Sequence, residues 1–282
     1  MPNLATATAG KAVAPHQRFT FDGALAGESL AFEARLFAGT HRLNWSLAPF
    51  KKRGDEGTNV ERAMRIEATL TRYGDGVREW YAPVPTDFNG EVVRGSDLKA
   101  KLAFGRLRIH RGAQADAVVL PLQAGFLLSA SGCLSLVASD GITCVAAHAG
   151  LRSMLRWGKE ADTPHESVIY QVAREFSDPK RATVWLFFSI RPDRLLYPAN
   201  HEAYGPENRA LHDLMRKRGY REALTSVGGI HMPVLAGLQI AETGMTLSPP
   251  GMHAYLKEDV PDTRSSPPYN THRSLIAITR MR

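Results

Sequence analysis

The stretch that decides the fold runs from Gly125 to Arg152 and reads GFLLSASGCLSLVASDGITCVAAHAGLR. Asp140-Gly141 stands between two apolar runs within it, and both residue types tolerate the positive φ that a two-residue type I′ turn requires. The stretch therefore predicts a β-hairpin. Counting outward from a turn at Asp140-Gly141 places Cys133 directly opposite His148.

This predicted register brings a thiol and an imidazole side by side. It pairs Ser139 with Ile142 next to the turn, and Cys133 with His148 at the far end. Direct cross-strand partners have Cβ atoms about 4.5–5.5 Å apart, close enough for a hydrogen bond or for a shared metal ion. A shift of one residue would put the two side chains on opposite faces of the sheet.

The same register bears on the two cysteines of the chain. Cys144 lies on the face of Cys133, but it is four residues from His148, which is about 13 Å along a strand. A disulfide needs Cα atoms within about 7 Å. We therefore expect Cys133 and Cys144 to be free thiols, as suits a reducing compartment.

Composition sets broad limits. The chain has 282 residues, 44% of them hydrophobic and 22% charged, which is typical of a globular protein of one large or two small domains. No apolar run approaches the length of about 20 residues that spans a bilayer. Residues 1–17 are small and polar without an apolar core, so they predict a loose N-terminal tail and no secretory signal. We expect a cytoplasmic protein.

The net charge of +7 comes from 35 basic and 28 acidic residues. The basic residues are scattered, with short clusters only at 51–53 and 216–218, whereas proteins that bind nucleic acid concentrate them on one element. Nucleic acid is therefore not the favoured partner. A solvated surface explains the charge, and a positive field also suits a small anionic substrate such as phosphate or a nucleotide. The sequence predicts no oligomeric state.

Hydrophobic periodicity predicts the remaining elements. Besides the hairpin, we expect strands over residues 18–21, 29–36, 77–81, 106–110, 117–120, 182–190 and 274–280. We expect helices from a capping box at Thr58 to Glu61 as far as Gly74, from near Leu151, and over 166–176, 206–217 and 232–243. Since residues 18–282 contain no clear linker, the prediction is one mixed α/β domain, with a sheet covered by helices on both faces.

The residues around Cys133 and His148 allow more than one interpretation. A buried cysteine that packs as a small apolar group, beside a histidine bonded to the backbone, would produce the same sequence. Two chemistries would also produce it. A zinc-like metal centre needs a third protein ligand and an open position, whereas a thiol nucleophile needs the imidazole as its base and a donor for the oxyanion.

Three segments of the chain resemble a known family signature. They are Ala115-Asp116-Ala117, Gly132-Cys133-Leu134, and the run from Val145 to Arg152. They are similar to the ADA, ADC and AAVHAGWRG segments of the YfiH-like family, also called laccase-domain or multicopper polyphenol oxidase proteins. Weaker similarities follow in order along most of the chain, namely Leu43-Asn44, Gly54-Asp55, Val60-Glu61 and the segment Tyr269 to Arg273.

The resemblance implies a single α/β domain with a fold like that of YfiH and the cytotoxic necrotizing factor toxins. It implies a zinc or copper site made by a cysteine and two histidines, and purine nucleoside phosphorylase activity with adenosine deaminase or polyphenol oxidase activity. Carried over to this chain, the metal ligands are Cys133 and His148, and the catalytic residues are these two with Arg152, which would orient phosphate. Asn44 and Arg273 are the implied substrate-binding residues.

The chain departs from the family pattern at several of these positions. The family's second histidine lies in a QVHG motif, but residues 80–90 contain no histidine, and Asp87 is the candidate replacement ligand. Gly132, Leu151 and Ser153 stand where the family has Asp, Trp and Gly. The favoured function is a metal-assisted enzyme for the phosphorolysis or deamination of purine nucleosides. The alternatives are a non-catalytic relative that binds a ligand or partner, and a Cys-His thiol hydrolase or deamidase.

Overall fold

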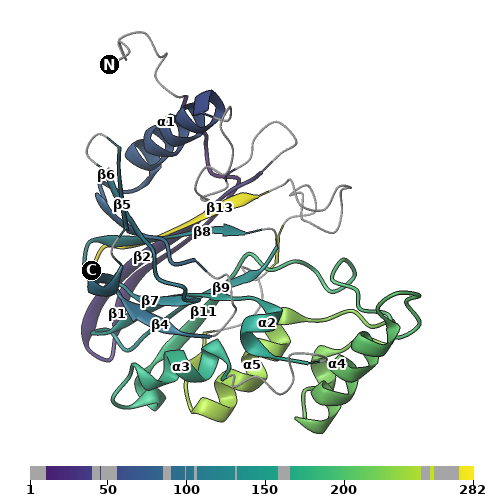
Figure 1. Cartoon of the computed structure of the whole chain (residues 1–282). Helices are drawn as coiled ribbons and strands as arrows, with labels where there is room; N and C mark the ends of the chain where they lie inside the picture. Colours follow the sequence, from purple (N-terminus) through teal and green to yellow (C-terminus); the bar gives the residue numbers. More distant parts are fainter. Residues whose placement is uncertain are drawn as a thin grey trace.

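A computed structural model gives the arrangement of the chain. It describes residues 11–39, 45, 56–84, 90–98, 100–104, 107–130, 132–157, 166–248, 255–256 and 273–282. In this part of the chain the strands form two stacked sheets. Figure 1 shows helix α1 on the outer side of one sheet and helices α2 to α5 on the outer side of the other, so the molecule has four layers in the order α/β/β/α.

The first sheet has the strand order β1-β2-β13-β8-β3-β6-β5. Its strands are β1 (Gln17–Leu25), β2 (Glu28–Phe37), β3 (Glu79–Tyr81), β5 (Ala100–Phe104), β6 (Leu107–Arg111), β8 (Ala124–Ala130) and β13 (Ser274–Arg280). β13 pairs with β2 on one side and with β8 on the other, both antiparallel. The strand that is last in the sequence therefore lies inside the sheet.

The second sheet has the order β12-β11-β9-β10-β7-β4. Its strands are β4 (Val92–Arg94), β7 (Ala117–Val119), β9 (Leu134–Ser139), β10 (Cys144–Ala149), β11 (Thr183–Phe187) and β12 (Thr246–Leu247). Every residue of β9 and β10 is buried, as the apolar faces of the hairpin predicted. The mixed α/β class is thus confirmed, although the strands divide between two sheets where the sequence predicted one.

The helices follow the predicted periodicity. They are α1 (Glu56–Tyr73), α2 (Leu151–Met154), α3 (Val168–Arg174), α4 (Gly205–Lys217) and α5 (Met232–Thr243). α5 matches its predicted range, and Gly244 directly after it, with a φ of +81°, closes the last turn. The capping box was misplaced, because α1 begins at Glu56 and Thr58 therefore lies inside the helix. α2 is only one turn long.

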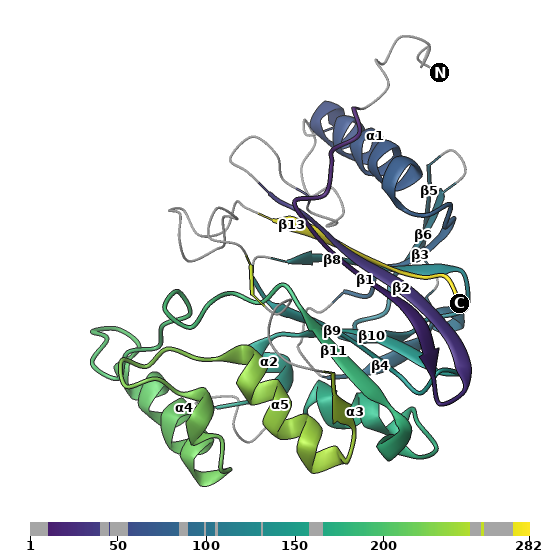
Figure 2. The ribbon, with the colours of Figure 1, turned by 180° about the vertical axis from the view of Figure 1, so that it is seen from behind.

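Three apolar clusters hold the layers together. The cluster between the sheets contains Phe32 and Phe126 from the first sheet and Val137, Cys144 and Phe187 from the second. A second cluster joins the second sheet to the helices α2 to α5, and a third joins the first sheet to α1. The view from behind in Figure 2 shows the same four layers. Both faces of each sheet are therefore used for packing.

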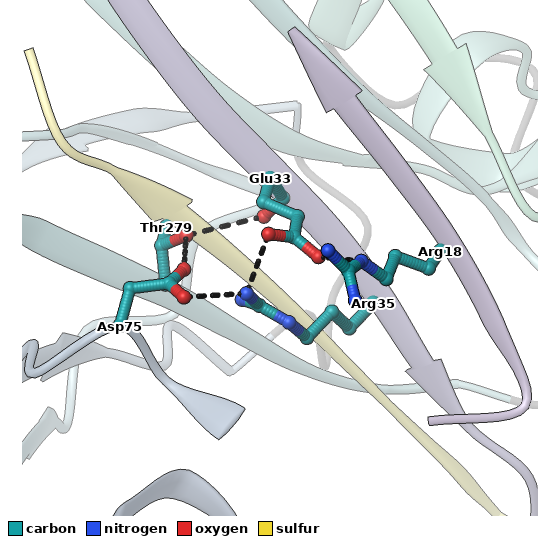
Figure 3. Close-up of polar contacts among 5 residues, drawn as sticks. All are labelled: Arg18, Glu33, Arg35, Asp75 and Thr279. Atoms are coloured by element: carbon teal, nitrogen blue, oxygen red, sulfur yellow. Dashed lines mark hydrogen bonds and ion pairs between the residues drawn. The ribbon is translucent and has the colours of Figure 1, made fainter. Parts of the chain in front are cut away.

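A network of charged side chains lies on the first sheet near its α1 side (Figure 3). Arg35 Nη2 is 2.6 Å from a carboxylate oxygen of Glu33 and 2.6 Å from Asp75 Oδ1. Arg18 Nε is 2.5 Å from the other oxygen of Glu33, and Thr279 Oγ1 donates to Asp75 Oδ2 at 2.9 Å. The network ties β1, β2 and β13 to the loop that follows α1.

The N-terminal part of the described chain contacts the domain. The backbone N–H of Val13 donates to Thr69 Oγ1 in α1 at 3.1 Å, and that of His16 donates to the carbonyl of Leu36 at 2.7 Å. The division into a tail of residues 1–17 and a single domain of residues 18–282 stays a prediction. Among the described helices none is long and apolar enough to cross a membrane. Cytoplasmic localisation also stays a prediction.

Candidate functional site: a cysteine, a histidine and a buried aspartate

The hairpin forms as predicted, but its turn is longer. Ser139 pairs with Cys144, so the loop holds four residues and not two. Asp140 Oδ1 accepts hydrogen bonds from the backbone N–H of Ile142 at 3.0 Å and of Thr143 at 2.7 Å. These bonds satisfy loop donors with a side chain, as Asp commonly does in turns. The predicted pairing of Ser139 with Ile142 was therefore wrong by two residues.

The shift of two residues changes the neighbour of His148 but not its face. His148 lies opposite Ser135, and Cys133 precedes the first residue of β9. Because side chains alternate along a strand, a shift of two keeps Cys133, Ser135 and His148 on one face, toward the layer between the sheets. Cys133 is thus a diagonal neighbour of His148, and its thiol is hydrogen-bonded to the imidazole. Neither Cys133 nor Cys144 forms a disulfide, as predicted.

A buried carboxylate holds the other side of the imidazole. His148 Nδ1 lies 2.8 Å from Asp116 Oδ1, and the backbone N–H of His148 donates to the carbonyl of Asp116 at 2.7 Å. Asp116 directly precedes β7, and β7 pairs with β10, so Asp116 is the cross-strand neighbour of His148 on the side away from Ser135. A proton on Nδ1 leaves Nε2 for the thiol of Cys133.

Further donors fix the carboxylate of Asp116, which has no exposed surface. Ser153 Oγ in α2 donates to Oδ1 at 2.6 Å, and the backbone N–H of Gly90 donates to Oδ2 at 2.9 Å. Ser153 is one of the positions where the chain departs from the family pattern. Its hydroxyl supplies a contact that the glycine found there in the family has no side chain to make.

The charges of these groups are coupled. Burial alone would lower the pKa of His148, but the negative charge of Cys133 and the hydrogen bond to Asp116 raise it to about 10. Burial would raise the pKa of the Cys133 thiol, but the charge and hydrogen bond of His148 lower it. The pKa of Asp116 is also lowered, because bonds from His148, Ser153 and Gly90 outweigh burial. The arrangement favours a thiolate beside an imidazolium ion.

The residue at position 150, two residues after His148, must be small. An added Cβ at Gly150 would lie 2.6 Å from Cε1 and 2.9 Å from Nε2 of His148. Real Cβ contacts do not come so close, so the ring would have to move. The glycine therefore allows the backbone to turn from β10 into α2 directly against the imidazole. This is a physical reason for the sequence His148-Ala149-Gly150.

The other predicted residues separate into three groups. Arg273 lies near Cys133, since its positive charge lowers the pKa of that thiol. Arg152 lies instead over the ring of Trp157, with 4.5 Å from Cζ to the ring centroid. Its charge is not among those that shift the pKa of Cys133 or His148. Asn44 and Asp87 lie outside the described residues.

The sequence alone does not assign a role to Asp116 or Ser153. Asp116 belongs to the ADA segment, and its place just before a predicted strand is a signal, because functional side chains are common where strands meet loops. Ser153 stands at a departure from the family pattern. Asp116 reaches His148 through the pairing of β7 with β10, and Ser153 reaches Asp116 from α2. Both contacts join distant parts of the chain, so the local sequence does not reveal them.

The described donors do not complete the implied metal site. Within the described ranges, no three His, Cys, Asp or Glu side chains are grouped to hold an ion. Cys133 and His148 are two candidate ligands, and Nδ1 of His148 is bonded to Asp116. Catalytic zinc takes three protein ligands and an open position. Among the described residues, Cys133 and His148 therefore supply two of these three ligands, and a bond from the other ring nitrogen to a carboxylate is also common in metal-binding histidines.

Comparison with known proteins identifies the fold. No family model and no curated protein matches the sequence. Solved structures do match, and they are proteins of the YfiH-like, or DUF152, class, so the chain has the fold that the sequence resemblance implied.

Three of these structures show the extent of the similarity. The Neisseria meningitidis protein NMB0706, described as DUF152, has a TM-score of 0.61 and 16% identity, over 94% of this chain and 99% of its own. YlmD from Geobacillus stearothermophilus has a TM-score of 0.55 and 13% identity, and the hypothetical protein YfiH from Bacillus licheniformis has 0.55 and 12%. Each of these two covers 90% of this chain and 92% of its own.

Proposed function

We propose that the protein is a thiol-dependent hydrolase that cleaves an amide or ester, with Cys133 as nucleophile and His148 as acid and base. The observation that carries the proposal is the hydrogen-bonded series from Cys133 through His148 to the buried Asp116. A nucleophile within reach of a base, which a third group orients, is the common arrangement of covalent acyl transfer. The pKa of the thiol is lowered, as such a nucleophile requires.

The reaction would proceed in two steps. The Cys133 thiolate attacks the carbonyl carbon, and the His148 imidazolium gives its proton to the leaving nitrogen or oxygen, so that a thioester and a free amine or alcohol form. Water then attacks the thioester while neutral His148 takes a proton from it. The carboxylic acid leaves, and the thiolate and imidazolium are restored.

Asp116 and Arg273 would have supporting roles in this reaction. Asp116 keeps a proton on Nδ1 and stabilises the imidazolium, as the carboxylate of a catalytic triad does. Arg273 places a positive charge near Cys133 and would attract an anionic group of the substrate. A small anionic amide or ester is thus the substrate class that we propose.

The alkylation rate of each cysteine as a function of pH tests the proposal. With iodoacetamide and detection by mass spectrometry, Cys133 should react at a pH below the ordinary thiol range of about 8.5. Cys144 is an internal control, because it is 1% exposed and burial raises its pKa to about 11. A Cys133 that reacts no faster than Cys144 at neutral pH would contradict the proposal.

A matched pair of variants sharpens this test. His148→Asn should return the alkylation of Cys133 to the ordinary thiol range, because the neighbouring imidazolium is lost. His110→Asn is the control, since His110 is also paired with a carboxylate, Glu79 at 2.5 Å, but lies on the first sheet. This control should leave the pH profile of Cys133 unchanged.

The metal-assisted phosphorolysis or deamination of purine nucleosides is the competing function. It requires a third ligand from residues outside the described ranges, such as Asp87. Metal analysis of protein purified without added ions, together with adenosine cleavage in phosphate buffer, tests it. About one zinc or copper per chain with nucleoside turnover would favour this function. If the protein is free of metal and Cys133 is inert, the result supports the alternative that this chain is a non-catalytic relative.

A further inference from the structure

Three of the helices beside the second sheet are connected by one buried side chain. Gln239 lies in α5 and has no exposed surface, and α2 and α3 belong to the same layer of helices in Figure 1. Its Nε2 donates to the carbonyl of Met154 in α2 at 3.2 Å, and its Oε1 accepts from the hydroxyl of Ser167, which caps α3, at 2.5 Å. One amide group thus joins the helix that contains Ser153 to the start of α3.

The hydrogen bonds of this amide leave it one orientation. The Met154 carbonyl can only accept, so the NH₂ group of Gln239 must point toward it. Ser167 Oγ accepts from the backbone N–H of Ile169 at 3.2 Å, and it donates its own proton to the Gln239 oxygen. Tyr220 shares a further hydrogen bond with the Gln239 side chain. A buried polar group whose donors and acceptor are all satisfied makes its surroundings rigid.

The first connection from Gln239 reaches Asp116 through α2. This helix has one turn, and so short a helix has almost no stability of its own. The carbonyls of a last turn lack partners inside their helix, and Gln239 supplies a donor to that of Met154. Ser153, the residue before Met154, donates to Asp116 Oδ1 at 2.6 Å. The position of this hydroxyl therefore depends on a contact from α5.

The second connection reaches the other oxygen of Asp116 through the start of α3. An added Cβ at Gly90 would lie 2.4 Å from the carbonyl oxygen of Glu166 and 3.4 Å from the carbonyl carbon of Ser167, so the backbone at Gly90 packs directly against this segment. The N–H of Gly90 donates to Asp116 Oδ2 at 2.9 Å. Both oxygens of the carboxylate are therefore held by donors whose segments are joined by Gln239.

We infer that Gln239 is a positioning residue of the Cys133 site, which acts through Ser153 and Gly90 on the carboxylate of Asp116. Within the described ranges, its hydrogen-bond partners do not belong to the pair of Cys133 and His148, so its effect on the pair is indirect. A carboxylate whose donors have moved orients its imidazole less well. The effect on hydrolysis rests on the proposed function, whereas the effect on the imidazole does not.

Proton NMR and iodoacetamide alkylation of the full chain test this role in Gln239→Met. The Nδ1 proton of His148, bonded to Asp116, should give a downfield resonance that is assigned by its loss in His148→Asn. In Gln239→Met this resonance should shift or broaden. The pH midpoint of Cys133 alkylation should rise by about half a unit, which is about a threefold lower rate at a fixed pH below the midpoint. Ile240→Ala is the matched control, because Ile240 is 1% exposed in the same helix and packs in an apolar cluster, and it should leave both signals unchanged.

A second variant serves if Gln239→Met does not fold. Ser167→Ala removes one partner of the amide, so it should change both signals in the same direction but by less. The positioning role is contradicted if a folded variant, checked by circular dichroism, matches Ile240→Ala in both signals. An inert Cys133 together with a shifted His148 resonance would contradict the hydrolase and support the role of Gln239. A low alkylation midpoint and a His148 resonance that Gln239→Met both leaves unchanged would support the hydrolase and contradict this role.

Discussion

Two clusters of charged side chains in the described sheets are built differently. On the first sheet, Arg35 holds Glu33 and Asp75 in short ion pairs. On the second, Asp116 holds His148, which is bonded to Cys133. Arginine keeps its proton at any ordinary pH, whereas an imidazole and a thiol exchange theirs. The first cluster is therefore suited to holding strands together, and the second to proton transfer.

The pKa directions support this distinction. In the first cluster, burial raises the pKa of Glu33 in spite of the charges of Arg35 and Arg18. In the second, the neighbours outweigh burial for Cys133, His148 and Asp116 alike. Catalytic centres commonly contain several groups whose pKa values are shifted by specific partners. Four substitutions test this difference between the clusters, and their expected effects decrease from the first to the fourth.

The first change is Asp116→Asn. The amide cannot stabilise the imidazolium and permits the wrong tautomer of His148, so hydrolysis should fall by about 10²–10⁴-fold. The alkylation midpoint of Cys133 should also move to higher pH. Ser153→Ala, which removes one donor to the same carboxylate, should cause a smaller change in the same direction. If the pH midpoint of Cys133 alkylation is unchanged in Asp116→Asn, then Asp116 has no part in the site.

The second change is Arg35→Met. It leaves Glu33 and Asp75 without their shared partner, and removal of one member of a buried ion pair costs about 3–5 kcal/mol of unfolding free energy. Urea denaturation measures this loss. Arg18→Met is the control, because the Arg18 side chain is 64% exposed and such pairs contribute about 0–1 kcal/mol. Cys133 reactivity in the folded variant should stay unchanged.

The third change is Gly150→Ala. The added Cβ would displace the ring of His148, and a displacement of about 1 Å can reduce a rate by about 100-fold. Hydrolysis and Cys133 alkylation should both decrease, while the unfolding midpoint changes less than in Arg35→Met. Gly76→Ala is a control for the loss of a glycine, since an added Cβ there meets no atom within 4 Å, although its φ of +75° carries some strain.

The fourth change, Glu33→Gln, tests the pH dependence of stability. The pKa of Glu33 is raised in the folded state, mainly by burial. The folded chain therefore binds more protons than the unfolded chain above the ordinary carboxyl pKa of 4.5, so this group makes stability fall as pH rises through that window. One group changes the slope of the unfolding free energy against pH by at most about 1.4 kcal/mol per pH unit. Denaturation between pH 4 and 7 should show a shallower fall in the variant.

Local signals in the sequence predicted many of the elements. Pro206 near the start of α4 and Gly244 after α5 mark helix ends by their backbone preferences, and both helices were predicted within one residue. The turn was predicted less well. Asp140 is compatible with a two-residue turn, but its carboxylate also caps a four-residue loop, and the choice between them depends on contacts that local sequence does not contain.

The candidate site was predicted only in part, because some of its contacts join distant parts of the chain. His148 lies in β10 and Cys133 directly precedes the adjacent β9, and the alternation of side chains kept them on one face although the register was wrong. Asp116 lies 32 residues from His148 and reaches it only through the pairing of β7 with β10. The division into two sheets depends likewise on distant pairings, such as β13 between β2 and β8, that periodicity does not encode.

The interior position of β13 has a consequence for the order of assembly during translation. β2 and β8 are synthesised long before the strand that joins them, so until it arrives both present unpaired backbone groups, which favour aggregation. Arg273 immediately precedes β13 and contributes its charge to the thiol of Cys133. A nascent chain that stalls before this segment would therefore carry an incomplete sheet and a less acidic, less reactive thiol.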